Sequence, residues 1–225
     1  MTQSSTDPAL AARLTGMRLY VVSDAGQSPA RVLVSVSAAC AGGADVIQLR
    51  RKGGDDMETY LLAERCRAAT AAWGALFIVD DRLDVAMAVD ADGVHLGQAD
   101  LPVAAARRLW PGRLVGVSTH SLAQALAAQQ AGADYLGVGP VWATPTKPGR
   151  AAVGLELVAA VAAAAVRIPW VAIGGIDAAN AGEVLDAGAR RLAVVRAVCA
   201  AADPQAAAAA LRGQIEARPA AAAVA

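Results

Sequence analysis

The sequence predicts an α/β fold of one domain, a closed (β/α)8 TIM barrel in which a helix follows each parallel strand. Two observations lead to this prediction. Short apolar segments alternate with segments of helical composition through eight repeats in 225 residues, a length and order typical of such a barrel. The apolar segments are continuous rather than alternating, as expected for parallel strands buried on both faces. An open doubly wound sheet is disfavoured because no G-x-G-x-x-G follows the first segment.

The repeats can be delimited along the chain. The expected strands span residues 18–23, 45–50, 75–79, 93–96, 114–117, 134–138, 169–173 and 191–195. The expected helices span residues 30–41, 57–73, 83–89, 102–110, 121–131, 155–165, 179–187 and 203–215. Glycines after several of these helices supply stop signals. We therefore expect an N-terminal extension over 1–16, a barrel domain over 17–217 and a flexible alanine-rich tail over 218–225.

The composition excludes several classes of protein. Hydrophobic residues make up 56% and charged residues 18%, which indicates a sizeable core rather than disorder. The formal net charge is zero, so no basic surplus indicates a nucleic-acid partner. The polar N-terminus lacks the apolar stretch of a signal peptide, and no apolar run is long enough to span a membrane. We expect a cytoplasmic protein with no membrane partner, and the sequence leaves a homo-oligomer open.

The three cysteines, Cys40, Cys66 and Cys199, fit the same cytoplasmic setting. They show neither the spacing of a metal site nor that of a disulfide framework. We expect each to be a small, buried apolar residue.

Polar residues collect where the expected strands end, which is the edge that carries the active site in barrels of this kind. After the second strand, Gln48, Arg50 and Lys52 share parity, so an extended chain points them the same way. Ile47 and Leu49 would point the other way, toward the helices. We therefore expect Gln48 and Arg50 to project into the mouth of the barrel.

Carboxylates follow the next two strands. Asp80 and Asp81 follow the third strand and Asp100 the fourth. Asp81 and Asp100 suit Mg²⁺, a hard ion that keeps several waters and takes phosphate oxygens. For Asp100 a helix cap is the simpler explanation, because it stands two residues before Pro102 at an expected helix start. The nearby cations change this balance toward a metal site. A metal together with Arg50, Lys52 and Lys147 would neutralise several phosphate charges, which indicates a diphosphate.

The loop after the sixth strand has the spacing Thr-x-Thr-Lys, with Thr144, Thr146 and Lys147 set among prolines and glycines. Hydroxyl groups donate hydrogen bonds to phosphate oxygens and the lysine supplies a compact charge, so an anion site is one interpretation. An ordinary polar loop is the other. Ser118, at the end of the fifth strand, belongs to the same edge.

A second anion site is expected on the other side of the mouth. Gly174 and Gly175 follow the seventh strand, and main-chain amides near Val195 and Arg196 follow the eighth. This arrangement matches the phosphate site that is common in barrels. The mouth is therefore expected to hold two phosphate-bearing groups, one with a metal and one without.

The two histidines suggest no catalytic base. His95 lies inside an apolar strand, where a hydrogen-bonded core histidine is the favoured interpretation, and His120 follows the fifth strand. We assign a role to neither. The sequence contains no evident Ser-His-Asp set, nucleotide fingerprint or cluster of His and Cys metal ligands.

Together these motifs resemble the thiamine-phosphate synthase (thiamine-phosphate pyrophosphorylase) family. The resemblance covers the chain from Leu19 to about Leu211, and the combination of motifs is specific although each glycine motif alone is not. It rests on Gln48-Leu49-Arg50-Arg51-Lys52, Asp81-Arg82, Asp92-Gly93-Val94-His95-Leu96-Gly97-Gln98-Ala99-Asp100, Gly116-Val117-Ser118-Thr119-His120, Gly137-Val138-Gly139-Pro140, Thr144-Pro145-Thr146-Lys147 and Ile173-Gly174-Gly175-Ile176.

The resemblance implies a barrel transferase with Mg²⁺ as cofactor and phosphorylated small molecules as substrates. Such an enzyme condenses 4-amino-2-methyl-5-hydroxymethylpyrimidine diphosphate with 4-methyl-5-(2-phosphoethyl)thiazole, or its carboxylated precursor, to thiamine phosphate and diphosphate. A dissociative, carbocation-like step is expected, without a general base. The implied metal ligands are Asp81 and Asp100. The implied contacts of the pyrimidine diphosphate are Gln48, Arg50, Lys52, Asp80, Ser118 and Lys147. Those of the thiazole phosphate are Thr144, Thr146, Gly175, Val195 and Arg196.

Two positions depart from the family pattern. Asp80 stands where the family usually has asparagine, and the extra carboxylate could repel the diphosphate or move toward the metal. Arg196 stands where serine is common, and could add a charged phosphate contact. Two alternative functions remain: a thiazole tautomerase of the same fold, which needs neither metal nor diphosphate, and a non-catalytic barrel that binds thiazole phosphate. Retention of Lys52, Asp81, Asp100 and Lys147 argues against the tautomerase.

Overall fold

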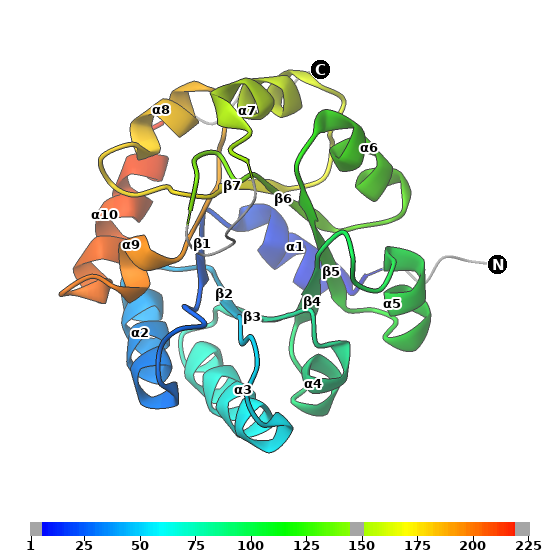
Figure 1. The fold of residues 1–225 in the computed structure, drawn as a ribbon, viewed down its shortest axis with the longest axis vertical. Helices are drawn as coiled ribbons and strands as arrows, with labels where there is room; N and C mark the ends of the chain where they lie inside the picture. The colour runs from blue at the N-terminus through cyan, green and yellow to red at the C-terminus, as the bar shows by residue number, and fades with distance from the viewer. Residues whose placement is uncertain (1–5, 145–150, 219–225) are drawn as a thin grey trace.

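The computed structural model describes residues 6–144 and 151–218, and it confirms the predicted barrel. Eight parallel strands pair in chain order, and β8 closes the sheet by pairing with β1. Figure 1 shows the strands as an inner ring with most of the helices around it. The strands are β1 Leu19–Val22, β2 Val46–Leu49, β3 Leu76–Asp80, β4 Gly93–Leu96, β5 Leu114–Thr119, β6 Tyr135–Val138, β7 Trp170–Ile173 and β8 Leu192–Val194.

Each expected helix is present, and two further helices appear. The expected ones are α2 Pro29–Ala41, α3 Asp56–Ala71, α4 Leu83–Ala88, α5 Val103–Leu109, α6 Leu122–Gln130, α7 Gly154–Ala163, α8 Ala181–Asp186 and α10 Pro204–Glu216. The additional ones are α1 Pro8–Gly16, within the expected N-terminal extension, and the single turn α9 Arg196–Cys199 after β8. None of the described helices is long and apolar enough to cross a membrane. Most of the expected C-terminal tail lies outside the described residues.

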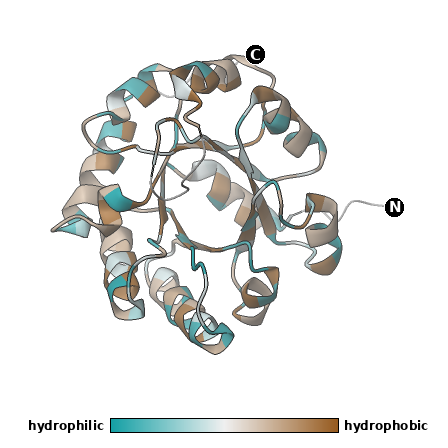
Figure 2. Ribbon diagram, viewed as in Figure 1, coloured by the Kyte–Doolittle hydropathy of each residue, from teal (hydrophilic) through white to brown (hydrophobic). Residues whose placement is uncertain are grey.

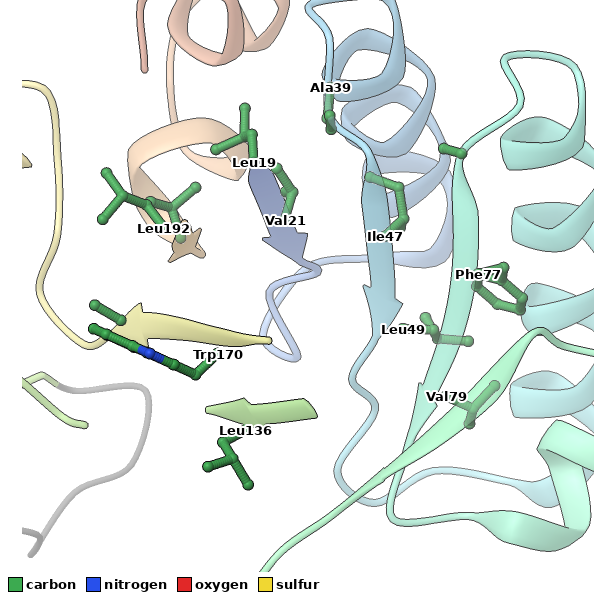
Figure 3. Close-up of a cluster of buried hydrophobic side chains, with 14 of the residues drawn as sticks. Leu19, Val21, Ala39, Ile47, Leu49, Phe77, Val79, Leu136, Trp170 and Leu192 are labelled. Atoms are coloured by element: carbon green, nitrogen blue, oxygen red, sulfur yellow. The ribbon is translucent and has the colours of Figure 1, made fainter. Parts of the chain in front are cut away.

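The buried apolar side chains form two layers. The outer layer lies between the strands and the helices, and Figure 3 shows part of it, including Ile47 and Leu49 of β2 beside Phe77 and Val79 of β3. Figure 2 shows the hydrophobic colouring concentrated on the strand ring and on parts of the helices. The expectation that Ile47 and Leu49 point toward the helices is therefore confirmed.

The inner layer fills the barrel and is closed at one end by α1. Leu10 and Leu14 of α1 belong to the same buried cluster as Tyr20, Leu76 and other strand residues that face the barrel interior. Because α1 immediately precedes β1, it covers the end at which the strands begin. The opposite end, at which the strands finish, is the end left for a functional site.

Candidate active site

A cavity of about 340 Å³ opens where the strands end, a size within the usual range for small-molecule sites. Its walls include main-chain and side-chain groups that follow several different strands. Of the residues expected at the site, those that line it are Gln48, Arg50, Asp80, Ser118, Thr144, Gly175, Val195 and Arg196. Thr146 and Lys147 lie outside the described residues. The roles of all these residues stay predictions.

The end of β2 carries the cations of the site, as its parity predicted. Gln48 and Arg50 line the cavity, and the Lys52 ammonium lies 3.8 Å from a carboxylate oxygen of Asp80. The Arg50 Nε is 3.5 Å from the same oxygen, and Gln48 Nε2 donates a hydrogen bond of 2.5 Å to the other one. The Asp80 carboxylate is thus held between an amide and two cations on the wall of the cavity.

Asp81 turns the chain away from β3 at the rim. Its φ of 60° lies in the left-handed region, which aspartate tolerates better than most residues. The Asp81 amide donates to the main-chain oxygen of His95 at 2.8 Å, and its carboxylate pairs with Lys52. The Asp81 side chain is 24% exposed, so its oxygens remain accessible from solvent.

Asp100 closes a short turn after β4 and is not a helix cap. Its carboxylate accepts a hydrogen bond of 2.6 Å from the Gly97 amide, whereas Pro102 occupies the N-cap position of α5. The explanation of Asp100 as the cap of the following helix is therefore wrong. The same loop reaches the end of β5, because Gln98 donates to the Ser118 main-chain oxygen at 2.7 Å.

No cluster of three or more His, Cys, Asp or Glu side chains suited to a metal occurs in the described ranges. A site that uses two carboxylates would take its remaining ligands from water and substrate, which is how Mg²⁺ is usually held beside phosphates.

The loops that follow β6 and β7 pack tightly against each other. Gly174 and Gly175 have φ values of 111° and 69°, and a Cβ at Gly174 would lie 2.4 Å from the Pro140 Cα. The Val141 amide donates to the Ile173 carbonyl at 2.9 Å. The two glycines are thus required by main-chain conformation and by this close approach, in addition to any contact with a ligand.

Buried polar side chains lie beneath the cavity. His95 contacts the Tyr135 hydroxyl through Nδ1 and the Ser118 hydroxyl through Nε2, as expected of a hydrogen-bonded core histidine. Tyr20 and Tyr135 contact each other at 2.9 Å, and burial raises the pKa of both hydroxyl groups well above its ordinary value. Neither tyrosine was among the residues predicted for the site. The signal was present, because a tyrosine inside a buried strand needs a hydrogen-bond partner.

The cysteines behave as expected. All three are buried and none forms a disulfide. Burial raises the pKa of the Cys40 and Cys199 thiols to about 11 and that of Cys66 to about 12, so they are poor nucleophiles near neutral pH.

The fold and the cavity define a class of protein, a (β/α)8-barrel enzyme whose mouth combines cations with accessible carboxylates. Comparison with known proteins identifies the family. The family model for thiamine monophosphate synthase matches residues 19–198. The chain is 49% identical over 215 residues to the thiamine-phosphate synthase of Mycolicibacterium vanbaalenii, covering 91% of this chain and 97% of the relative. It is 52% identical over 206 residues to that of Chloroflexus aurantiacus, covering 91% and 95% of the two chains.

A solved structure gives the same result. Thiamine phosphate pyrophosphorylase from Pyrococcus furiosus superimposes with a TM-score of 0.82 at 42% identity, over 92% of this chain and 98% of that one. The chain belongs to the thiamine monophosphate synthase family. It is accordingly a transferase, as the sequence predicted.

Proposed function

We propose that this barrel joins an aminopyrimidine diphosphate to a thiazole phosphate at the mouth described above, forming thiamine phosphate and releasing diphosphate. The observation that carries the proposal is the convergence of Arg50 and Lys52 on Asp80 and Asp81 beside the cavity. Two unrelated surface cations would not be expected to meet the same pair of carboxylates at the edge of the cavity. A diphosphate leaving group needs positive charge at the place where its own charge develops.

The pyrimidine diphosphate occupies the side of the cavity formed by β2, β3 and β5. Gln48 and Ser118 line the cavity and offer neutral hydrogen-bonding groups, while Arg50 and Lys52 offer charge. Lys147 would add a further cation from the loop after β6. Asp80 does not repel the diphosphate in this arrangement, because its charge is offset by the two neighbouring cations.

Mg²⁺ is the metal that fits the rim. The candidate ligands, Asp81 and Asp100, are hard carboxylates that keep exposed oxygen atoms, and each follows one of two adjacent strands. When bound, the ion would offset negative charge on the departing diphosphate. Lys52 already pairs with Asp81, so this lysine would shift toward the diphosphate as the carboxylate takes up its ligand role.

The thiazole phosphate occupies the opposite side, between the loops after β6, β7 and β8. Thr144 and Gly175 line that part of the cavity, with Val195 and Arg196 at the start of α9. A short extra helix after the eighth strand is a frequent part of phosphate sites in barrels. Thr146 would complete this subsite, and the Arg196 side chain would add charge that a serine lacks.

The reaction needs positioning more than proton transfer. The bond between the pyrimidine methylene carbon and the diphosphate oxygen breaks, and the diphosphate keeps the electron pair next to Arg50 and Lys52. The electron-rich aminopyrimidine supports the carbocation-like methylene, and the thiazole nitrogen lone pair then forms the new C–N bond. Holding the two rings in one cavity makes this attack intramolecular in effect. No step requires a general base.

We also propose that the enzyme acts in the cytoplasm. The three buried free thiols support this setting, because they fit a reducing compartment.

An omission assay tests the proposed function. The purified chain is incubated with both substrates and Mg²⁺, and diphosphate and thiamine phosphate are quantified together. Equimolar products that disappear when the metal or either substrate is omitted are expected. Conversion of a thiazole isomer without metal would indicate the tautomerase, and binding of thiazole phosphate without turnover would indicate the non-catalytic barrel.

A further inference from the structure

A continuous chain of hydrogen bonds crosses the barrel beneath the cavity. Its five links measure 2.5, 2.7, 2.9, 3.1 and 2.9 Å in order. Each member comes from a different strand, and all are buried. The members, in order, are Asp80, Gln48, Tyr20, Tyr135, His95 and Ser118.

The carboxylate end of the chain fixes the direction of its first links. The Asp80 carboxylate lies beside Arg50 and Lys52 and accepts a hydrogen bond from the Gln48 nitrogen, which therefore faces Asp80. The Gln48 oxygen then faces Tyr20, which has one proton and donates it there. The orientation of the amide thus follows from the chemistry of its two neighbours.

The direction of the remaining links follows from the single proton on each tyrosine hydroxyl group. Since the Tyr20 proton is used on Gln48, the contact between the tyrosines needs Tyr135 as donor. The Tyr135 oxygen must then accept from Nδ1–H of His95. A neutral imidazole with its proton on Nδ1 has a bare Nε2, so the Ser118 hydroxyl donates to it. Burial raises the pKa of both tyrosines, which keeps one proton on each of them.

We propose that Asp80 and Tyr20 are positioning residues that set the polarity of this chain, that is, the direction in which its hydrogen bonds run from donor to acceptor. They hold the Gln48 amide in one orientation and His95 in its Nδ1–H tautomer. Each end of the amide is used once, which leaves one N–H and one oxygen lone pair of Gln48 in a fixed order on the cavity wall. An aminopyrimidine presents a ring nitrogen acceptor beside an amino donor and is complementary to that order. This link to the substrate rests on the proposed function, whereas the tautomer does not.

Nitrogen NMR of the histidine side chains in the substrate-free protein tests the tautomer directly. The sequence contains two histidines, so comparison with His120→Gln assigns the signals of His95. We expect the proton of His95 on Nδ1 and none on Nε2. A proton on Nε2, or protons on both nitrogens at neutral pH, would overturn the proposal.

Two variants test how polarity is transmitted. In Tyr20→Phe the Tyr135 hydroxyl loses its acceptor and is expected to donate to Nδ1, which moves the His95 proton to Nε2. In Ser118→Ala the proton is expected to stay on Nδ1, because Tyr135 still sets it. Tyr60→Phe is the matched control, since this half-buried tyrosine of α3 contacts only Glu64 among the hydrogen bonds found in the described residues. An unchanged tautomer in Tyr20→Phe, or a shifted one in Ser118→Ala, would contradict the proposal.

Steady-state kinetics of Tyr20→Phe test whether the fixed Gln48 amide positions the substrate. Loss of one of its two anchors leaves the amide less well held, so Tyr20→Phe is expected to raise KM for the pyrimidine diphosphate by about threefold or more, with KM for the thiazole phosphate unchanged. An inverted tautomer with an unchanged pyrimidine KM would refute the positioning role. If the wild-type chain showed no turnover, the proposed function would fail while the tautomer result would still decide the polarity.

Discussion

Replacing Arg50 with methionine separates the structural role of this side chain from its role in binding. Methionine keeps a long side chain but removes the charge next to the buried Asp80 carboxylate. At the observed separation of 3.5 Å, the gross attraction is about 5 kcal/mol at an effective dielectric constant of about 20. Desolvation offsets part of this attraction, and truncating one partner of a buried ion pair costs about 3 kcal/mol. We expect Arg50→Met to lower the free energy of unfolding by about 3 kcal/mol.

A second substitution distinguishes stability from function. Asp80→Asn removes the carboxylate charge that Arg50 no longer offsets, while its side-chain oxygen can still accept from Gln48. The double variant is therefore expected to regain about 2 kcal/mol relative to Arg50→Met alone. Its activity should not recover, because the cation that faces the diphosphate is still missing. We expect kcat/KM to stay at least about 100-fold below wild type in both variants that lack Arg50.

Urea unfolding followed by tryptophan fluorescence and a diphosphate-release assay provide the two measurements. Arg51→Met is the matched control, because Arg51 pairs with Glu58 rather than with the carboxylates of the site. It is expected to change the free energy of unfolding by less than about 1 kcal/mol and to leave turnover intact. An Arg50→Met protein as stable as wild type, or a double variant that regains activity, would refute the reasoning.

Three further predictions concern other parts of the molecule. Lys147→Ala is expected to reduce turnover at least about 100-fold without changing the melting temperature, and near-wild-type activity would contradict the role of this lysine. Leu14→Ala is expected to lower the free energy of unfolding by about 2–4 kcal/mol, because Leu14 is 2% exposed in the plug formed by α1; KM values should be unchanged, and a stable variant would argue against the plug. The buried thiols have a raised pKa, so the folded state holds their protons more tightly than the unfolded chain, in which thiols ionise near pH ~8.5. The free energy of unfolding should therefore fall as the pH rises from about 8.5 toward 11. Replacing Cys40, Cys66 and Cys199 with alanine should reduce this dependence on pH, and an unaltered dependence would contradict the prediction.

The barrel could be predicted from the sequence because each repeat carries its own local signal. Continuous apolar segments and the glycines that end helices are signals carried by residues close together in the sequence. The strand and helix positions predicted from them were therefore correct to within a few residues. The strand at Leu114 was expected to end at Val117 but continues to Thr119, because Ser118 and Thr119 are polar yet buried. Helix α1 was missed although Asp7, Pro8 and two leucines four positions apart mark a helix start and an apolar face.

The composition of the cavity wall was also predictable, but its internal contacts were not. Strand parity correctly directed Gln48 and Arg50 inward, since alternation is a property of any extended chain. The hydrogen bond between Tyr20 and Tyr135 joins residues 115 positions apart, which meet only when the barrel closes. No local pattern reports such a contact. The helix-cap alternative for Asp100 failed for a related reason, because the hydrogen-bond partner of this carboxylate is decided by the path of the loop from Gly97.

The most direct test of the proposed site is a crystal structure with thiamine phosphate, diphosphate and Mn²⁺ bound together. Anomalous scattering locates the metal independently of the protein contacts. We predict one metal peak ligated by Asp81 and Asp100, with the diphosphate between this ion and the side chains of Arg50 and Lys52. A metal peak away from both carboxylates, or a diphosphate bound beside Gly175, would contradict the proposed arrangement of the mouth.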